Sequence, residues 1–391
     1  MHEVSDSTFA DVFAGFIGRK SGFPRIHREE LEALCRSLIS GMLGGNTCLP
    51  LTSSHENLLA SCPLVSSGAD TPLVVANNSL YLARYYSYES LLAQALAERA
   101  AVDHKIEHAE ALLNRCLASS ADITDQQREA ARVALNKGVC IISGGPGTGK
   151  TTTVVKIVTL LVLHYGPDLQ IALSAPTGKA AIRLKESVSA QIPTLSVNES
   201  TKQALPHQAQ TLHRLLGGRM YSPVFKYNSM RRLPWDVVIV DEASMVDIAL
   251  MSKLVDALST GARLILLGDK GQLASVESGA VLSECISVLP ENVVELRVAH
   301  RFNSDISELA DYVNRGDGDA AGKVLDEPGN ASVVRAGPDW IDECAECYER
   351  YLTMVRDVKR VKQLPELFEF FSMFRILCAL RKGTYGVDGI N

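Results

Sequence analysis

Residues 144–151 read Gly144-Gly145-Pro146-Gly147-Thr148-Gly149-Lys150-Thr151, and this stretch decides the expected fold. It matches the pattern G-x-x-x-x-G-K-[ST] in full. The apolar run Val139–Ile142 precedes it, and a helix-like run, Lys150–His164, follows it. Glycines let backbone N–H groups converge on phosphate oxygens at a helix N-terminus, where the helix dipole is positive. The sequence therefore predicts a phosphate-binding loop between a strand and a helix.

The residue types of this loop indicate ATP and Mg²⁺ as cofactors. Lys150 is expected to reach the β- and γ-phosphates, and the Thr151 hydroxyl is expected to coordinate Mg²⁺. The remaining predicted nucleotide contacts come from the loop and the residue after it: Gly144, Gly145, Pro146, Gly147, Thr148, Gly149 and Thr152.

Two acids follow a second apolar run, Val237–Val240. Ligands of parallel sheets bind at the carboxyl ends of the strands, so Asp241 is expected to hold Mg²⁺ and Glu242 to orient or deprotonate the attacking water. Acids in this position also cap helices, but the phosphate-binding loop upstream favours catalysis. We expect the glycine turn ending in Lys150 and the acid pair to lie on adjacent sheet edges and to hold one Mg–triphosphate between them.

Two further polar turns complete the predicted catalytic set. In Leu266–Leu273, Gln272 is expected to sense the γ-phosphate and Asp269 to steady the turn. Arg301 follows the apolar run Val293–Leu296 and is expected to stabilise transition-state charge from a neighbouring domain. The alternative for Arg301 is an ordinary surface arginine.

The pattern along the chain predicts a parallel sheet with helices on both faces. Apolar runs of strand length alternate with helix candidates, including Ile171–Ser174, Arg263–Leu267 and Ile248–Ser259. Gln191–Gln210 is expected to be a polar surface excursion, and Asp317–Asn330 a loop.

The first 115 residues carry no recognisable catalytic chemistry. Helical patterns cover Glu30–Met42 and Glu89–Leu113, and short strand-like runs lie at Leu73–Val75 and Leu80–Leu82. We expect a small, mainly helical domain that packs against the rest of the chain or against a partner.

Composition favours a cytoplasmic protein. Of 391 residues, 46% are hydrophobic and 21% charged, and the longest apolar run, Ile157–Leu163, is too short to cross a membrane. No secretory signal begins the chain, and the nine cysteines lack the spacing of a disulfide framework. Cys344 and Cys347 have C-x-x-C spacing, but they lie in a helix-like stretch, Trp340–Val355, and are expected to be core thiols.

Charge is distributed unevenly along the chain. The formal net charge is −6, yet Leu169–Trp235 contains nine Lys or Arg residues and only two acids. Affinity for phosphates depends on local positive charge. This basic segment, residues 169–235, is therefore a candidate nucleic-acid surface, although a solvated basic face is the alternative.

The motifs in this order resemble those of superfamily 1 DNA helicases, and in detail those of the RecD family. Ile123–Ala130 resembles the family's adenine-reading motif, with Gln127 as the base contact. Ser174–Ala181 and Thr211–Gly217 resemble the motifs that line the single-stranded DNA track. The resemblance assigns DNA contacts to Pro176, Thr177, Lys179, Thr211 and His213.

The resemblance implies a RecA-like P-loop NTPase core, α/β in class, in residues 116–298. It also implies an N-terminal partner-docking domain in residues 1–115 and the start of a second RecA-like domain in residues 299–391. The implied function is an ATP-dependent 5′→3′ helicase or translocase subunit of a RecBCD-type helicase–nuclease in double-strand break repair and recombination. Its implied partners are RecB-like and RecC-like subunits in a heterotrimer, single-stranded DNA and duplex DNA ends; no membrane is implied.

Two departures from the family pattern matter. Gly271 stands where the family often has an acid, and the chain reaches Asn391 without counterparts of the family's last motifs. The alternative hypothesis is therefore a non-translocating module that binds ATP and DNA and docks on a RecC-like partner. We expect slow or absent DNA-stimulated ATPase from residues 1–391 alone. The chain lacks the Leu-Ser-Gly-Gly-Gln signature of a transporter-type ATPase.

Overall fold

A computed structural model of the chain describes residues 6–104, 106, 109–117, 124–219, 222, 224–272, 278–279, 281–297, 304–327, 332–357 and 364–391. The chain divides into two compact units, Met1–Arg301 and Phe302–Asn391. No helix in these ranges combines the length and the apolar character that crossing a bilayer requires.

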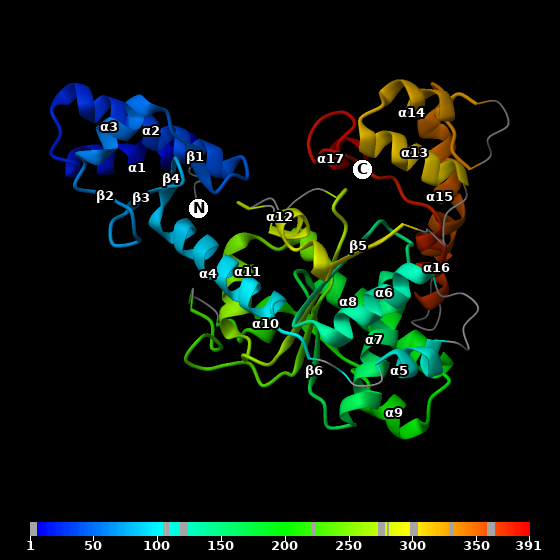
Figure 1. Cartoon of the computed structure of the whole chain (residues 1–391). Helices are drawn as coiled ribbons and strands as arrows, with labels where there is room; N and C mark the ends of the chain where they lie inside the picture. The colour runs from blue at the N-terminus through cyan, green and yellow to red at the C-terminus, as the bar shows by residue number, and fades with distance from the viewer. Residues whose placement is uncertain are drawn as a thin grey trace. The chain divides into compact units, whose positions relative to one another are not determined.

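The first unit is built on a six-stranded, all-parallel sheet (Figure 1). Its strand order is β10-β5-β9-β8-β6-β7. The strands are β5 (Val139–Gly144), β6 (Ile171–Ala175), β7 (Ala209–Thr211), β8 (Val237–Val240), β9 (Arg263–Gly268) and β10 (Val293–Leu296). The four central strands, β5, β9, β8 and β6, are buried along their whole length, which explains their continuous aliphatic sequences.

Helices cover both faces of this sheet, as predicted. Alternate residues of each strand point to opposite faces, so Cys140 and Ile142 join one core and Val139 and Ile141 the other. The first core receives α6 (Asp125–Asn136), α7 (Lys150–Tyr165) and α8 (Gly178–Gln191). The second receives α4 (Ala83–Ala100), α10 (Leu212–Leu215), α11 (Ile248–Ala257) and α12 (Val281–Val288).

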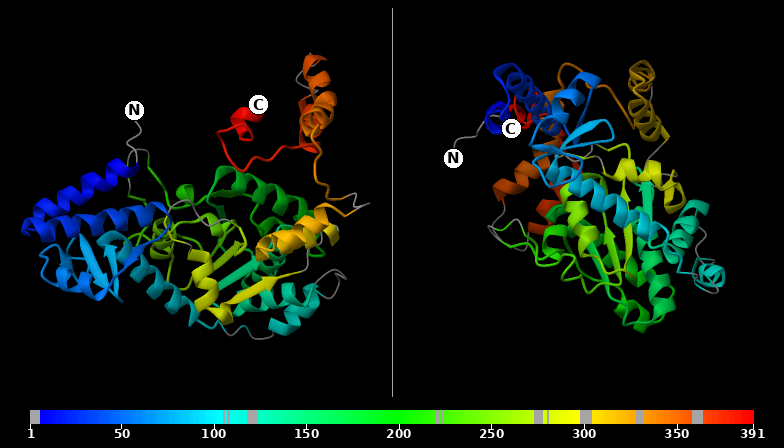
Figure 2. Two further views of the ribbon diagram at one scale, coloured as in Figure 1. Left: turned by 90° about the horizontal axis from the view of Figure 1, so that it is seen from above. Right: turned by 60° about the vertical axis from the view of Figure 1, so that its left-hand side comes forward.

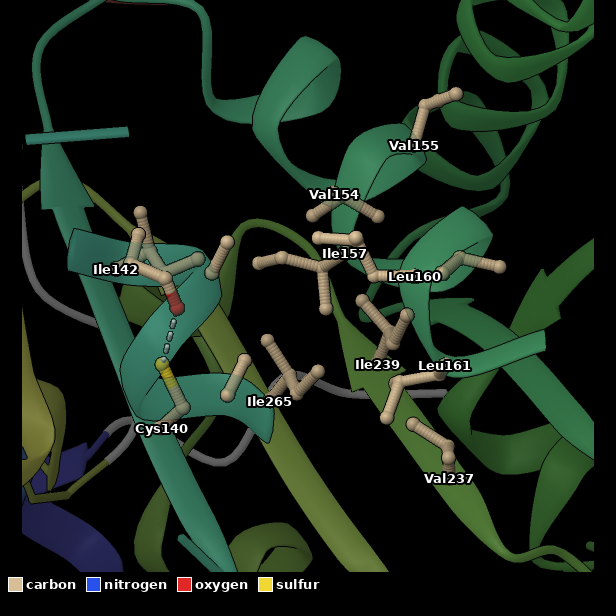
Figure 3. Close-up of a cluster of buried hydrophobic side chains, with 14 of the residues drawn as sticks. Cys140, Ile142, Val154, Val155, Ile157, Leu160, Leu161, Val237, Ile239 and Ile265 are labelled. Atoms are coloured by element: carbon tan, nitrogen blue, oxygen red, sulfur yellow. Dashed lines mark hydrogen bonds between the residues drawn. The ribbon is translucent and has the colours of Figure 1, made fainter. Parts of the chain in front are cut away.

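Figure 3 shows the first core around α7. Ile142, Ile239 and Ile265 come from three different strands and lie against Ile157 and Leu160 of that helix. The packing fixes the axis of α7, whose first residue is Lys150. The sheet therefore sets the position of the phosphate-binding loop.

The N-terminal part of this unit has its own apolar core and a four-stranded sheet. Helices α1 (Asp6–Lys20) and α2 (Arg25–Leu43) lie side by side (Figure 2). The sheet order is β1-β4-β3-β2, from β1 (Cys48–Pro50), β2 (Val65–Ser66), β3 (Leu73–Ala76) and β4 (Ser79–Leu82), with α3 (Ser53–Ala60) between β1 and β2. The predicted strand-like runs are β3 and β4, and Asn77 and Asn78 turn between them with positive φ.

Two predicted segments of the first unit differ in the structure. The single helix expected over Glu89–Leu113 is two helices, because α4 ends at Ala100 and α5 covers Ala109–Leu117. Between them, the His104 N–H donates to the Asn136 carbonyl at 2.7 Å, so the chain turns to follow the sheet. The excursion Gln191–Gln210 contains η1 (Ile192–Thr194) and α9 (Glu199–Ala204), held by buried Ile192 and Leu205.

The regular elements described in the second unit are all helices. They are α13 (Ser304–Arg315), α14 (Gly318–Leu325), α15 (Trp340–Asp357), α16 (Leu364–Met373) and α17 (Val387–Ile390). A loop was expected over Asp317–Asn330, and this prediction is wrong for the residues of α14. The helix begins there because the Asp317 carboxylate accepts the Ala320 N–H at 3.0 Å.

The two C-x-x-C thiols lie on α15. Cys344 is half-buried and Cys347 is exposed, so the expectation of a core thiol is wrong for Cys347. Their spacing of three residues places them about one helical turn apart, as neighbours on the helix surface. Across the described residues, no group of three or more His, Cys, Asp or Glu is placed to hold a metal ion.

Candidate nucleotide-binding site

The predicted phosphate-binding loop joins the carboxyl end of β5 to the N-terminus of α7. Gly149 caps α7 with φ +83°, a left-handed conformation that favours glycine. A Cβ at Gly144 would lie 2.8 Å from the Leu296 carbonyl oxygen and 2.7 Å from the Thr148 hydroxyl. Glycine is required at Gly149 because of its backbone angles, and at Gly144 because there is no space for a side chain.

Lys150 turns its ammonium group back over the loop. Its Nζ donates to the Gly144 carbonyl and, at 3.1 Å, to the Gly145 carbonyl. The Thr148 hydroxyl also donates to the Gly145 carbonyl, at 2.8 Å. The ammonium therefore lies at the mouth of the loop, where the predicted β- and γ-phosphates would bind.

Residues of the loop line a cavity of about 950 Å³. The cavity brings together Lys150, Thr151, Asp241, Glu242 and Gln272, which lie far apart in the sequence. The other lining residues are Gln127, Gly145, Pro146, Gly147, Gly149, Thr152, Lys156, Arg183, Leu184, Glu186, Ser187 and Gln191. Gly144 and Thr148 are not among the lining residues.

Asp241 and Glu242 follow β8, but β8 is not the neighbour of β5. Strand β9 lies between them in the sheet. All three strands are parallel, and their carboxyl ends share one edge. Both acids consequently line the same cavity as Lys150.

The two acids differ in environment. The Asp241 carboxylate accepts the Glu242 N–H at 2.9 Å. Burial raises the pKa of Asp241, although the Glu242 N–H opposes this shift. Glu242 has φ +53° and ψ 40°, a left-handed conformation that is unusual for a residue with a side chain. The following η2 (Ala243–Met245) begins directly after it.

The turn after β9 has the expected internal support. The Asp269 carboxylate accepts the Gly271 N–H at 2.9 Å, and the Asp269 carbonyl accepts the Gln272 N–H at 3.2 Å. The prediction that Asp269 steadies the turn is confirmed. Gln272 reaches the cavity from this turn.

Gln127 lies in the first turn of α6, which Thr124 caps by accepting the Gln127 N–H at 3.2 Å. Its side chain is 4% exposed and packs against the loop, 2.6 Å from where a Cβ on Gly149 would stand. Its Oε1 has no hydrogen-bond partner among the residues that the structure describes. A buried acceptor without a partner is unfavourable, so this atom fits a ligand donor such as an exocyclic amine.

The residues present fit a magnesium–nucleotide complex. Hydroxyl and carboxylate oxygens, which Mg²⁺ prefers, come from Thr151 and Asp241. Lys150 and the N-terminus of α7 supply positive charge for phosphates. Gln127, whose Oε1 has no hydrogen-bond partner among the described residues, lines the same cavity.

Comparison with known proteins is consistent with this site. Residues 127–278 match the AAA domain family. The chain is 38% identical to the RecBCD enzyme subunit RecD of Mycolicibacterium smegmatis, over 90% of this chain and 66% of that protein. It is 40% identical to the RecD subunit of Mycobacterium tuberculosis H37Rv, over 74% of this chain and 51% of that protein. The chain belongs to the RecD-like superfamily 1 helicases.

A more distant relative is the ATP-dependent RecD2 DNA helicase of Deinococcus radiodurans. It is 37% identical over 43% of this chain and 20% of that protein. The RecD-like chain spans about half to two thirds of the length of the RecD subunits it matches.

The predicted DNA contacts of this RecD-like chain lie at the same edge of the sheet. Strands β6 and β7 are paired so that Ala175 stands opposite Thr211. Thr177 and Thr211 each cap the helix that follows, accepting the N–H groups of Ala180 and Arg214. Lys179 and His213 are exposed, and Pro176 is half-buried.

Sequence reasoning missed part of the cavity wall. Lys156 of α7 and a row on α8, including Arg183, Glu186 and Gln191, also line it. Lys156 lies less than two turns after Lys150 on one helix, which was a usable signal. The α8 row had none, because only the packing of α8 on α7 brings it there. Arg301 lies outside the described residues.

Proposed function

We propose that this RecD-like chain binds Mg–ATP in the cavity and uses its hydrolysis to drive movement along DNA, as an ATP-dependent DNA helicase. The observation that carries the proposal is that Lys150, Asp241 and Glu242, from three places in the sequence, line one cavity at the carboxyl edge of the sheet. The names of the RecD and RecD2 relatives support the same activity.

In this proposal each side chain has one task. Lys150 and the N-terminus of α7 hold the phosphates, and Thr151 and Asp241 hold Mg²⁺, which when bound neutralises phosphate charge. Glu242 orients a water molecule and accepts its proton on the carboxylate. Gln272 contacts the γ-phosphate and Gln127 the base. Arg301 is proposed to add positive charge from its place after β10.

Single-stranded DNA is the proposed track. Pro176, Thr177, Lys179, Thr211 and His213 are its proposed contacts, within the basic segment. Aromatic rings lie among the cations there: Lys226 Nζ is 5.0 Å from the Tyr227 ring centroid, and His213 stacks edge-on with Phe225. Base stacking on such rings is worth about 1–3 kcal/mol per base. This is comparable with the free energy needed to open one base-pair step of duplex DNA, roughly 1.4 kcal/mol.

The finer assignments extend the family relationship. We propose 5′→3′ polarity, a role in double-strand break repair, and assembly with RecB-like and RecC-like subunits on duplex DNA ends. We further propose that residues 1–115 dock on the RecC-like subunit, residues 116–298 form the first motor domain and residues 299–391 begin the second. Duplexes with a 5′ or a 3′ single-stranded tail, offered to the assembled complex, test the polarity.

The central test is nucleotide binding and hydrolysis with and without single-stranded DNA. Lys150→Ala is expected to abolish hydrolysis and weaken nucleotide binding, because it removes the ammonium from the loop. Lys20→Ala, at the exposed end of α1, is the matched control and should behave as the wild type. A Lys150→Ala variant that hydrolyses ATP normally would overturn the proposed function.

A further inference from the structure

The phosphate-binding loop lies between two strands whose ends are tied together. In the order β10-β5-β9, the end of β5 is central, and Glu295 and Leu296 of β10 pair with Ser143 and Gly144. On the other side, Gly268 of β9 pairs with Ser143. A side chain just after β9 that contacts a side chain of β10 must therefore reach across the end of β5, where the loop begins.

Lys270 and Glu295 make such a contact. Lys270 follows β9 in the turn that carries Gln272, and its Nζ lies 2.5 Å from Glu295 Oε1. This ion pair spans the carboxyl end of β5, where the loop begins. It ties the Gln272 turn to β10.

The same carboxylate has a second cationic partner. The Arg297 guanidinium contacts Glu295 Oε2 at 3.0 and 3.2 Å. The Arg297 N–H also donates to Gln126 Oε1 at 2.9 Å, and Gln126 is the neighbour of Gln127 on α6. Arg297 is the last described residue before the segment that leads to Arg301 and the second unit.

We propose that Glu295 is a positioning residue. It links the turn that carries Gln272 to Arg297, which contacts the first turn of α6 and precedes the segment leading to the second unit. The inference rests on the proposed nucleotide site. Glu295 touches no predicted reacting atom and acts through Lys270 and Arg297. Displacement of the chain at Arg297 would be transmitted through Glu295 to the turn that carries Gln272.

The strength of the contact suits a reversible link. Lys270 and Arg297 are 55% and 74% exposed in their side chains, against 31% for Glu295. Hydrogen bonds from Lys270 and then Arg297 lower the pKa of Glu295, so it stays ionised at neutral pH. Ion pairs this exposed contribute little free energy. The contacts of Glu295 can therefore form and break as the chain at Arg297 moves.

The test compares a fluorescent non-hydrolysable ATP analogue with fluorescent ADP in equilibrium binding to the full chain. Glu295→Gln and Lys270→Gln are each expected to reduce the preference for the triphosphate about three- to fivefold, with ADP affinity within about twofold of wild type, the range of an exposed ion pair. The double variant should lose no more than Glu295→Gln alone, because that change already breaks the contact with Lys270. Lys270→Arg should retain the preference.

Glu291→Gln, an exposed acid in η3 (Pro290–Asn292) before the other end of β10, is the matched control and should match wild type. If Glu295→Gln does not give a wild-type melting transition, the nucleotide preference of Lys270→Gln is used to test the inference instead. Unchanged preference in a folded single variant, or losses that add in the double variant, would overturn the inference alone. A wild-type chain that binds neither nucleotide would overturn the proposed function as well.

Discussion

Glu242 occupies the left-handed region of backbone space, although it is not a glycine. Such a conformation costs roughly 1–3 kcal/mol and persists where the surrounding structure imposes it, commonly at functional sites. Here it lies between the buried end of β8 and η2 and places the residue on the wall of the cavity. The strain is consistent with a residue placed for chemistry.

Glu242→Gln is therefore expected to bind ATP without turning it over. The amide keeps the size and shape of the side chain but cannot accept a proton from water. Nucleotide retention on the protein and single-turnover hydrolysis measure the two effects. Glu284→Gln, an exposed acid on α12, serves as the control, and unchanged turnover in Glu242→Gln would remove that residue from the mechanism.

Asp241 is expected to make Mg²⁺-dependent nucleotide binding depend on pH. Burial raises the pKa of its carboxyl above the ordinary value, and a protonated carboxyl does not coordinate Mg²⁺. Mg²⁺-dependent nucleotide affinity should be complete above this raised pKa and fall by up to about tenfold per pH unit below it.

Calorimetric titration of Mg–nucleotide across pH measures that dependence. Asp241→Asn has no proton to exchange and should bind more weakly with a flatter pH profile. An affinity that stays constant down to about pH 3.9, the ordinary pKa of aspartate, would contradict the prediction.

At the scale of elements, one buried arginine holds α4 against the six-stranded sheet. Arg99, near the end of α4, donates to the carbonyls of Leu258, Ser259 and Ala262 at 3.0–3.2 Å. These carbonyls follow α11, so the guanidinium satisfies acceptors at the carboxyl end of that helix. Burial and the nearby Arg232 lower the pKa of Arg99, so its charge is held against an unfavourable environment.

Arg99→Met is expected to destabilise the protein by about 1–3 kcal/mol, because it removes a charged donor from the Ala262 carbonyl and leaves the Leu258 and Ser259 carbonyls with one donor each. Urea unfolding measures the change. Arg84→Met, an exposed position on the same helix, should leave the unfolding midpoint unchanged. Equal midpoints for both variants would show that α4 docks by apolar contact alone.

For the whole molecule, the sign of the charge changes along the chain. The basic segment carries +7 while the remaining residues carry −13. Proteins that neutralise DNA phosphates release counterions, so their affinity falls steeply with salt.

Binding to single-stranded DNA should therefore weaken as salt rises, with a log–log slope near −0.7 for each phosphate neutralised. Fluorescence anisotropy of a labelled oligonucleotide at several salt concentrations gives the slope. Lys179→Gln should make the slope shallower by about 0.7, the contribution of one phosphate contact, whereas Lys20→Gln on α1 should not change it. Affinity that is independent of salt would exclude the basic segment as the DNA surface.

Much of the six-stranded sheet and its phosphate-binding loop was predictable from local sequence. The strands β5, β6, β8, β9 and β10 are aliphatic runs that end in polar turns, and each was expected within two residues of its observed bounds. The loop before Lys150 was predictable because its glycines have no substitute: Gly144 leaves no space for a side chain, and Gly149 has a positive φ. The helical pattern over Trp340–Val355 was confirmed for the same local reason.

Local sequence was less informative where a partner element decides the outcome. The break between α4 and α5 depends on a backbone bond to Asn136, more than thirty residues later in the chain. The short helix α14 was missed because its glycines and aspartates suggested a loop, although Asp317 caps it.

By itself, the sequence determined which residues form the phosphate-binding loop and the acid pair, because backbone angles, apolar runs and turns are properties of neighbouring residues. Tertiary structure alone decided that β9 separates β5 from β8, that the α8 row lines the cavity, and that Lys270 meets Glu295 across the loop. The physical reason is that strand order follows from non-local hydrogen bonding and from the burial of both faces of the sheet. Those free energies depend on which distant segments come together.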